Sequence, residues 1–133
     1  MITWNNLDKL TSYQELEKTE SVDLAAVMAG ENGAERVKNY SVPMAEGLAY
    51  NYAAKKVDDT VLAALEKLAE EAQLTEKFEA LYNGEVVNTG EKRLVLHHMT
   101  RGQLGDAVEA DGVDKRTFYV EQQKKIAEFA NKV

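Results

Sequence analysis

Apolar residues recur every three or four positions along most of the chain, and this spacing predicts helices. The clearest apolar stripe follows Asp58, which is placed to cap a helix, and it contains Val61, Leu65, Leu68 and Ala72. The last predicted helix begins near Asp114, and its stripe contains Phe118, Gln122, Ile126, Phe129 and Val133. Such stripes are typical of helices that pack one face against other structure.

Shorter helices are indicated by capping residues and stop signals. Ser12 and Glu15 have the spacing of a capping box. Ser21 opens a second segment, which stops at Gly30. A third segment, residues 75–82, ends at an Asn-Gly pair, which is a common C-terminal signal.

Between Arg36 and Lys55 the pattern changes to alternation, which predicts strands. The alternating residues are Tyr40, Val42 and Met44 in the first run and Leu48, Tyr50 and Tyr52 in the second. A loop that contains a glycine separates the runs, so we expect a small β-hairpin with tyrosines as cross-strand pairs. Pro43 lacks a backbone donor and predicts an edge or a bulge in the first strand. The predicted fold class is therefore mainly α with a small antiparallel β-hairpin (α+β), in one helical unit over residues 1–133.

Composition and charge limit the possible functions. A length of 133 residues is about one domain's worth. The net charge of −7 disfavours nucleic acids and anionic membrane surfaces as partners. The absence of cysteine excludes thiol catalysis, disulfides and thiolate metal sites. No signal-peptide pattern and no membrane-length apolar run is present, so we expect a cytoplasmic protein.

The two histidines of the chain are adjacent, which makes them the first candidates for chemistry. Asn88 and Glu91 have capping-box spacing, and no glycine or proline interrupts residues 91–100, so a helix is predicted there. On a helix His97 and His98 would point about 100° apart and could not chelate one metal ion as a pair. Neither histidine has a metal-ligating residue four positions away. The pattern therefore predicts no metal site.

A catalytic role is also disfavoured by the neighbours of each histidine. His97 would share a face with Arg93 and Arg101, two cations that make it a poor proton acceptor. His98 would lie on a packing face with Leu94, Val95 and Met99. We therefore expect half-buried imidazoles that hydrogen-bond to the backbone.

Other polar stretches also lack the spacing that catalysis requires. The segment Gly102–Gly112 has no phosphate-loop spacing and predicts a surface loop with a turn at Asp111-Gly112. Glu70 and Glu71 are expected on a solvated helix face. The residues alone therefore predict no catalytic, substrate-binding or metal-ligating residue, and no cofactor.

The run VNTGEKRLVLHHMTR, residues 87–101, resembles a segment near the start of glucose-6-phosphate isomerases. The matching positions are Asn88, Glu91, Arg93, Val95, Leu96, His97 and Arg101. Residues 36–57 resemble the family's N-terminal hairpin. The helix from Asp59 and the phrases LYNGEVVN and VEADGVD follow in the family's order, so the resemblance covers nearly the whole chain. The chain departs from the usual pattern at four positions: Asn51, Ala53, Gly90 and Gly102.

The resemblance implies that the chain is the N-terminal helical part of a larger α/β sugar isomerase. In that family the sugar-phosphate loop and the catalytic glutamate, histidine and lysine follow the helix that corresponds to Asp114–Val133. No catalytic residue is therefore carried over, the sugar-phosphate-binding domains are expected to be absent, and the chain alone is expected to be inactive. The expected partner is the remainder of the isomerase chain, with a homodimer as a further assembly. Two alternatives stay open: an independent helical protein-interaction module and, ranked last, metal-dependent catalysis through His97.

Overall fold

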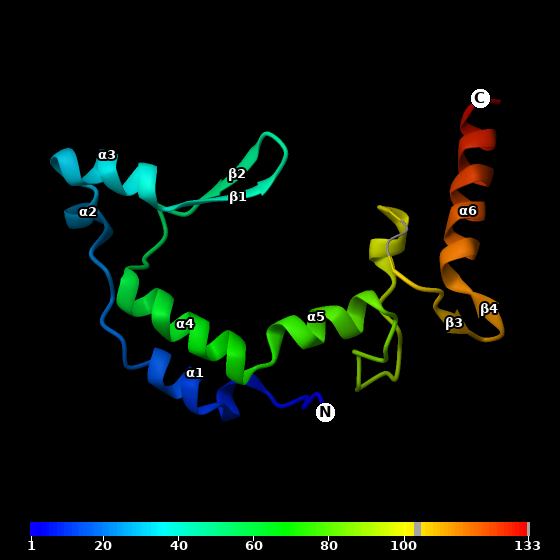
Figure 1. Cartoon of the computed structure of the whole chain (residues 1–133), viewed down its shortest axis with the longest axis horizontal. Coiled ribbons are helices and arrows are strands. Elements are labelled where there is room, and N and C mark those ends of the chain that lie inside the picture. The colour runs from blue at the N-terminus through cyan, green and yellow to red at the C-terminus, as the bar shows by residue number, and fades with distance from the viewer. Residues whose placement is uncertain (103–104, 133) are drawn as a thin grey trace. The chain divides into compact units, whose positions relative to one another are not determined.

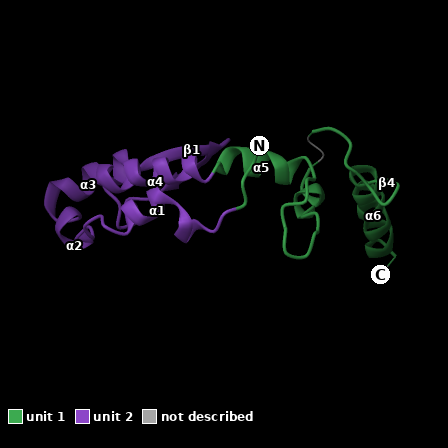
Figure 2. Cartoon of the chain, turned by 90° about the horizontal axis from the view of Figure 1, so that it is seen from below, with its two compact units in different colours: residues 1–4, 73–133 green, residues 5–72 purple. Residues whose placement is uncertain are grey.

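The computed structural model describes residues 1–102 and 105–132, about half of which are helical (Figure 1). They belong to two compact units: Asn5–Ala72, and Met1–Trp4 with Gln73–Val133 (Figure 2). The predicted fold class, mainly α with a small antiparallel hairpin, is confirmed. The single unit over residues 1–133 stays a prediction. Among the described helices, none combines the length and apolar character that crossing a bilayer requires.

The unit Asn5–Ala72 contains a 3-10 turn, four helices and one hairpin. In chain order these are η1 (Leu7–Lys9), α1 (Thr11–Leu16), α2 (Leu24–Val27), α3 (Gly30–Asn39), β1 (Ser41–Ala45), β2 (Leu48–Asn51) and α4 (Asp59–Glu71). Its buried residues are few and mostly small: Leu10, Ser12, Val22, Gly33, Arg36, Ala53 and Ala72. This unit therefore has only a small core.

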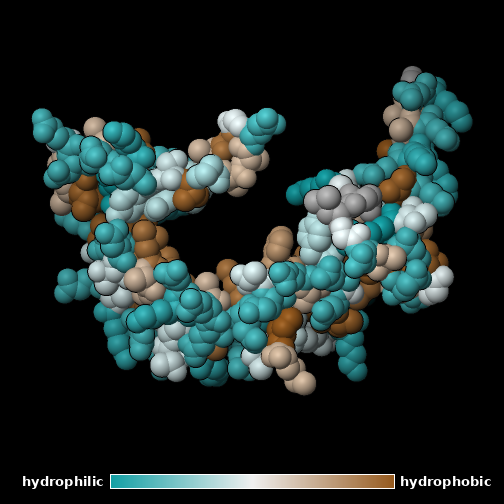
Figure 3. Space-filling view, viewed as in Figure 1, coloured by the Kyte–Doolittle hydropathy of each residue, from teal (hydrophilic) through white to brown (hydrophobic). Residues whose placement is uncertain are grey.

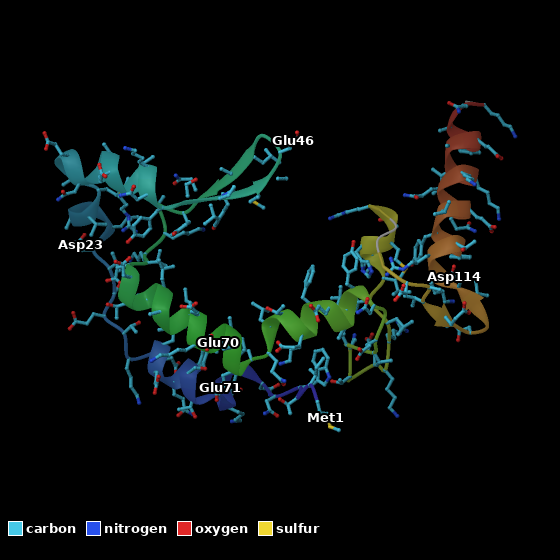
Figure 4. All side chains as sticks on the ribbon, viewed as in Figure 1. Met1, Asp23, Glu46, Glu70, Glu71 and Asp114 are labelled. Carbon is cyan, nitrogen blue, oxygen red and sulfur yellow. The ribbon has the colours of Figure 1, made fainter. Side chains whose placement is uncertain are left out.

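Helix α4 caps helix α1 in a way that the local sequence did not predict. The Glu71 carboxylate accepts hydrogen bonds from the backbone N–H of Thr11 (3.1 Å) and of Ser12 (2.7 Å), and a short one from the Ser12 hydroxyl. No side chain of α1 itself makes a capping hydrogen bond, so the capping box of Ser12 and Glu15 is wrong. Glu70 and Glu71 are both exposed, as expected of a solvated helix face, but Glu71 also lies next to α1 (Figure 4).

The turn between α2 and α3 differs from the expected single segment. Asp23, rather than Ser21, caps α2, and its side chain accepts from the Ala26 N–H at 3.1 Å. The helix ends at Val27, and Gly30 begins α3 instead of stopping a helix that reaches it. At Gly33 an added Cβ would lie 2.3 Å from the Met28 carbonyl oxygen, so the close approach of the two segments requires glycine.

The predicted hairpin is confirmed. Strands β1 and β2 pair antiparallel, with Val42 opposite Tyr50 and Pro43 opposite Ala49. The register shifts after Pro43, which is the irregularity that the proline predicts. The rings of Tyr40 and Tyr52 lie 5.1 Å apart across the strands, so these tyrosines form the expected cross-strand pair.

The connection from the hairpin to α4 is organised by a buried arginine. The Arg36 guanidinium donates to the carbonyl oxygens of Ala53 (2.8 Å), Lys55 (3.0 Å) and Val57 (2.6 Å), and it lies 4.1 Å from the centre of the Tyr40 ring. Satisfying three carbonyls at once fixes the path of this loop. Helix α4 then begins as predicted, because the Asp58 side chain accepts from the Val61 N–H at 2.9 Å.

The described residues of the other unit form two helices, one 3-10 turn and a second, very small hairpin. These are α5 (Leu74–Tyr82), η2 (His97–Thr100), β3 (Glu109–Ala110), β4 (Val113–Asp114) and α6 (Lys115–Ala130). Helix α5 stops at the predicted Asn-Gly signal, where Gly84 adopts a left-handed φ of 74°. Helix α6 begins after Asp114, as predicted. The core of this unit is a cluster of Leu96, Met99 and Val108, against which Leu94 and Tyr119 pack.

The chain start is held against α5. The Thr3 N–H and hydroxyl donate to Gln73 Oε1 at 2.8 and 2.9 Å, and Lys77 Nζ lies 5.4 Å from the centre of the Trp4 ring. The side chain of Trp4 remains 41% exposed. These contacts join Met1–Trp4 to the unit that contains α5.

The helix predicted over residues 91–100 is wrong, although its capping residues do interact. Asn88 Oδ1 accepts from the Glu91 N–H at 3.2 Å, as a cap would, but the backbone of Asn88 pairs with Arg93 in an isolated antiparallel bridge. Lys92 has a φ of 53°, which is outside the right-handed helical region. The Asn88–Glu91 spacing therefore closes a turn, and only His97–Thr100 is helical, as a short 3-10 segment.

The predicted turn at Asp111-Gly112 is confirmed, and it joins β3 to β4. Asp111 and Gly112 have φ values of 54° and 71°, the left-handed pair that tight hairpins favour. The two short strands were not predicted. The expectation of a surface loop at Gln103 and Leu104 lies outside the described residues.

Candidate functional site

The histidine segment has the geometry of a packing site. His98 is half-buried; its Nε2 lies 3.1 Å from the Tyr82 carbonyl oxygen and its ring stacks on Tyr82 with centroids 4.5 Å apart. Next to it Met99 is completely buried. The expected half-buried imidazole bonded to backbone is thus confirmed for His98, whereas His97 is exposed.

A buried arginine meets His98 at the same carbonyl group. Arg116 Nη2 donates to the Tyr82 carbonyl oxygen at 3.0 Å, and Arg116 Nε makes a short hydrogen bond to the Asp106 carbonyl oxygen. Only 6% of Arg116 is exposed. The guanidinium therefore ties the end of α5, the loop before β3 and the start of α6 together, with His98 packed alongside.

In the part of the chain that the structure describes, the cluster of His98 and Arg116 has no paired carboxylate that would make the imidazole a general base. Among the buried side-chain atoms of the described residues, His98 Nδ1 and Arg116 Nη1 have no hydrogen-bond partner. No carboxylate of the described residues forms an ion pair with either histidine, so nothing there orients an imidazole as a base. Within the same residues no three side chains of His, Asp or Glu are grouped closely enough to hold a metal ion.

The start of α6 carries a carboxylate with a perturbed pKa, and its role is structural. Asp114 accepts from the N–H groups of Arg116 (3.0 Å) and Thr117 (3.3 Å), and from the Thr117 hydroxyl at 2.5 Å. The hydroxyl of Thr117 is the main cause that lowers the pKa of Asp114. The Val108 N–H also donates to Asp114 Oδ1 at 3.3 Å and lowers the same pKa, so the shift reflects hydrogen bonds that hold the start of α6 in place.

The unit Asn5–Ala72 contains an apolar groove. It lies between the hairpin and α4, has a volume of about 510 Å³, and is lined by Val42, Tyr50, Tyr52, Lys55, Val57, Leu62 and Leu65. Only Lys55 is charged in this set. Reactive sites usually combine an apolar pocket with several convergent polar groups, and this groove lacks them. Its chemistry suits the contact of one protein surface with another.

Sequence reasoning missed three charged residues that organise the structure: Arg36, Glu71 and Arg116. Each is bonded to backbone groups far away in the sequence, so helical periodicity carries no direct signal for its partner. Glu71 alone had a local hint, because it adjoins Ala72 at the edge of the apolar stripe of α4.

Comparisons with known proteins identify the family. The family model described as phosphoglucose isomerase matches residues 51–133. Glucose-6-phosphate isomerase from Treponema denticola is 51% identical over 98% of this chain and 26% of its own length. The enzyme of the same name from Treponema pallidum is 39% identical over 99% of this chain and 25% of its own length.

A solved structure agrees with these sequence matches. The crystal structure of a glucose-6-phosphate isomerase from Chlamydia trachomatis superposes with a TM-score of 0.72 at 30% identity. The match covers 94% of this chain and 25% of that one. The chain thus spans about a quarter of the length of the relatives that it matches, and it corresponds to their N-terminal segment. By sequence and by fold, the chain belongs to the phosphoglucose isomerase family.

Proposed function

We propose that this chain is the N-terminal structural part of a glucose-6-phosphate isomerase. The intact enzyme would interconvert glucose 6-phosphate and fructose 6-phosphate in glycolysis and gluconeogenesis, in the cytoplasm. The observation that carries the proposal is the match of nearly the whole chain to about a quarter of each relative. In this role no residue of the chain is catalytic or binds the substrate, and its partner is the remainder of the isomerase polypeptide.

The balance of buried and exposed side chains supports a role within a larger protein. Among the described residues, eight apolar residues are buried, whereas sixteen large apolar side chains are exposed. Single exposed apolar side chains are normal, but contiguous patches mark surfaces that other structure covers. The alternative of an independent helical interaction module gains no support from the matches. A homodimer of the intact enzyme is a further part of the proposal.

Complementation tests this function directly. The purified chain is mixed with the separately produced remaining three quarters of the Treponema denticola enzyme, and isomerisation is followed in a coupled dehydrogenase assay. We expect no turnover from the chain alone, because it brings neither a placed base nor a sugar-phosphate site. We expect turnover to appear when the two polypeptides are combined. Activity that copurifies with the chain alone, or a mixture no more active than its separate components, would contradict the proposal.

A further inference from the structure

The hairpin presents an apolar surface to solvent. Val42 is 46% exposed, Met44 69%, Leu48 66% and Tyr50 47%. Figure 3 shows hydrophobic side chains along the hairpin and hydrophilic ones at its tip, where Figure 4 places Glu46. A two-stranded hairpin is marginally stable by itself. The exposed residues thus form a patch of the kind that marks an interaction site.

This patch continues into the groove between the hairpin and α4. Val42 and Tyr50 belong to both, and the groove adds Tyr52, Val57, Leu62 and Leu65 as apolar lining. Leu65, on α4, is still 39% exposed. Patch and groove therefore form one continuous apolar surface within a single unit, which we call the hairpin groove.

Charge distinguishes the hairpin groove from the rest of the chain. The chain carries a net charge of −7, yet the one charged residue of the groove lining is the cation Lys55. The backbone carbonyl of Lys55 is bound by Arg36, whereas its ammonium group forms no ion pair with the described residues. A ligand surface that is apolar and carries one carboxylate would complement both features.

Two observations favour the remainder of the enzyme as the occupant. About three quarters of each relative's length lies outside the part that this chain matches, which supplies ample polypeptide to cover the groove. A second copy of this chain would instead bring another net charge of −7 to the same surface, which opposes self-pairing there.

We propose that the hairpin groove docks an apolar segment of the remaining isomerase polypeptide, with an acidic side chain opposite Lys55. This inference rests on the proposed function and adds to it the surface through which the two parts associate. A few residues of such a surface carry most of the binding energy, and tyrosine is over-represented among them. Leu48 and Tyr50 make the main apolar contacts with the docked segment. Lys55 aligns that segment by pairing with its acidic side chain.

The experiment measures binding of the intact chain to the remaining three quarters of the Treponema denticola enzyme by titration calorimetry. Leu48→Glu and Lys55→Glu are each expected to weaken binding at least about tenfold. Two matched controls make the same chemical changes outside the groove: Leu7→Glu, at a residue that is 51% exposed, and Lys56→Glu, at an exposed lysine next to Lys55. Both controls are expected to bind within about twofold of the wild type. All four positions are exposed, and circular dichroism verifies that each variant is folded.

Amide hydrogen exchange provides a second readout. On binding, amides of the hairpin are expected to gain protection in the wild type but not in Leu48→Glu. If groove variants bind and restore activity as well as the wild type, the inference fails while the proposed function stands. If the wild type itself neither binds nor complements, both fail. A wild-type dimer that Leu48→Glu dissociates would assign the groove to a second copy and also overturn the inference.

Discussion

At the scale of single residues, Glu71 shows how a charged side chain on a helix surface becomes structural. Its carboxylate binds the first N–H groups of α1, which have no partners within that helix. The Ser12 hydroxyl is the main cause that lowers the pKa of Glu71, and the N–H groups of Ser12 and Thr11 add to it. A carboxylate that is favoured in the folded state stabilises it above the pKa of the unfolded chain, about 4.3 for glutamate.

Glu71 therefore stabilises the folded state more at neutral pH than in acid. The contribution of Glu71 to the free energy of unfolding is complete above the pKa that its carboxyl has in the unfolded chain. It is lost as the pH falls through the lower pKa of the same carboxyl in the folded protein. We expect Glu71→Gln to unfold at a lower temperature than the wild type at pH 7, and the difference to shrink in acid. Thermal unfolding monitored by circular dichroism over a pH series measures this, with Glu70→Gln as the control. Equal melting temperatures for Glu71→Gln and the wild type at pH 7 would refute the capping role.

The two histidines give a second residue-scale prediction. His98→Ala removes a ring stacked on Tyr82 and a hydrogen bond, so we expect a loss of about 1–2 kcal/mol in unfolding free energy. His97→Asn changes an exposed side chain and should stay within about 0.5 kcal/mol. Urea unfolding measures both free energies. Stoichiometric transition metal in the wild-type protein, detected by mass spectrometry, would contradict the packing role of this segment.

At the scale of elements, those with strong local signals were predicted and the others were not. Helices α4 and α6 have an aspartate cap and a long apolar stripe, and the hairpin has alternation and a glycine loop; all three were found where predicted. The helix over residues 91–100 failed because the Asn88–Glu91 pair is also compatible with a turn, and backbone pairing between Asn88 and Arg93 selects the turn. For α2 the predicted segment was found, but its cap is Asp23 rather than Ser21 and it ends before Gly30.

The histidine segment and the hairpin groove also differ in how far the sequence predicts them. The neighbours of His98 in the sequence, Leu94, Val95 and Met99, correctly predicted a packing site there, although the helix predicted over residues 91–100 was wrong. The hairpin groove could not be predicted, because its walls come from separate elements whose approach depends on Arg36 and the loop before α4. Contacts between a side chain and backbone groups far away in the sequence leave no periodic pattern from which they could be predicted.

The cap of α6 gives an element-scale prediction. Asp114→Ala removes acceptors for the Arg116 and Thr117 N–H groups and for the Val108 N–H. We expect a loss of about 1 kcal/mol in unfolding free energy, together with fraying of the first turn of α6. Urea unfolding and amide exchange at Thr117 measure the two effects. Glu109→Ala, an exposed carboxylate outside the cap, serves as control, and an equal effect of both variants would argue against capping.

At the scale of the whole molecule, helix α6 keeps much of its predicted stripe exposed. Phe118 is 42% exposed, Ile126 67% and Phe129 70%, while Val133 lies outside the described residues. Burying apolar area is favourable by about 25 cal/mol per Å². We therefore predict that the isolated chain self-associates through α6, against the repulsion between two copies that each carry a net charge of −7. Light scattering over a concentration series measures this, and Phe129→Glu should shift the mass toward the monomer. A wild type that stays monomeric at high concentration would disprove this prediction.

The attachment of Met1–Trp4 to α5 has an optical consequence. Trp4 is the only tryptophan of the chain, so its emission reports the environment beside Lys77 and therefore one unit alone. Four of the six tyrosines, Tyr13, Tyr40, Tyr50 and Tyr52, lie in the other unit, where their near-ultraviolet absorbance dominates. Tryptophan thus reports on one unit, and most of the tyrosine signal comes from the other, without any chemical modification. Coincident melting of both signals would identify one cooperative domain over residues 1–133, and two separate midpoints would identify two.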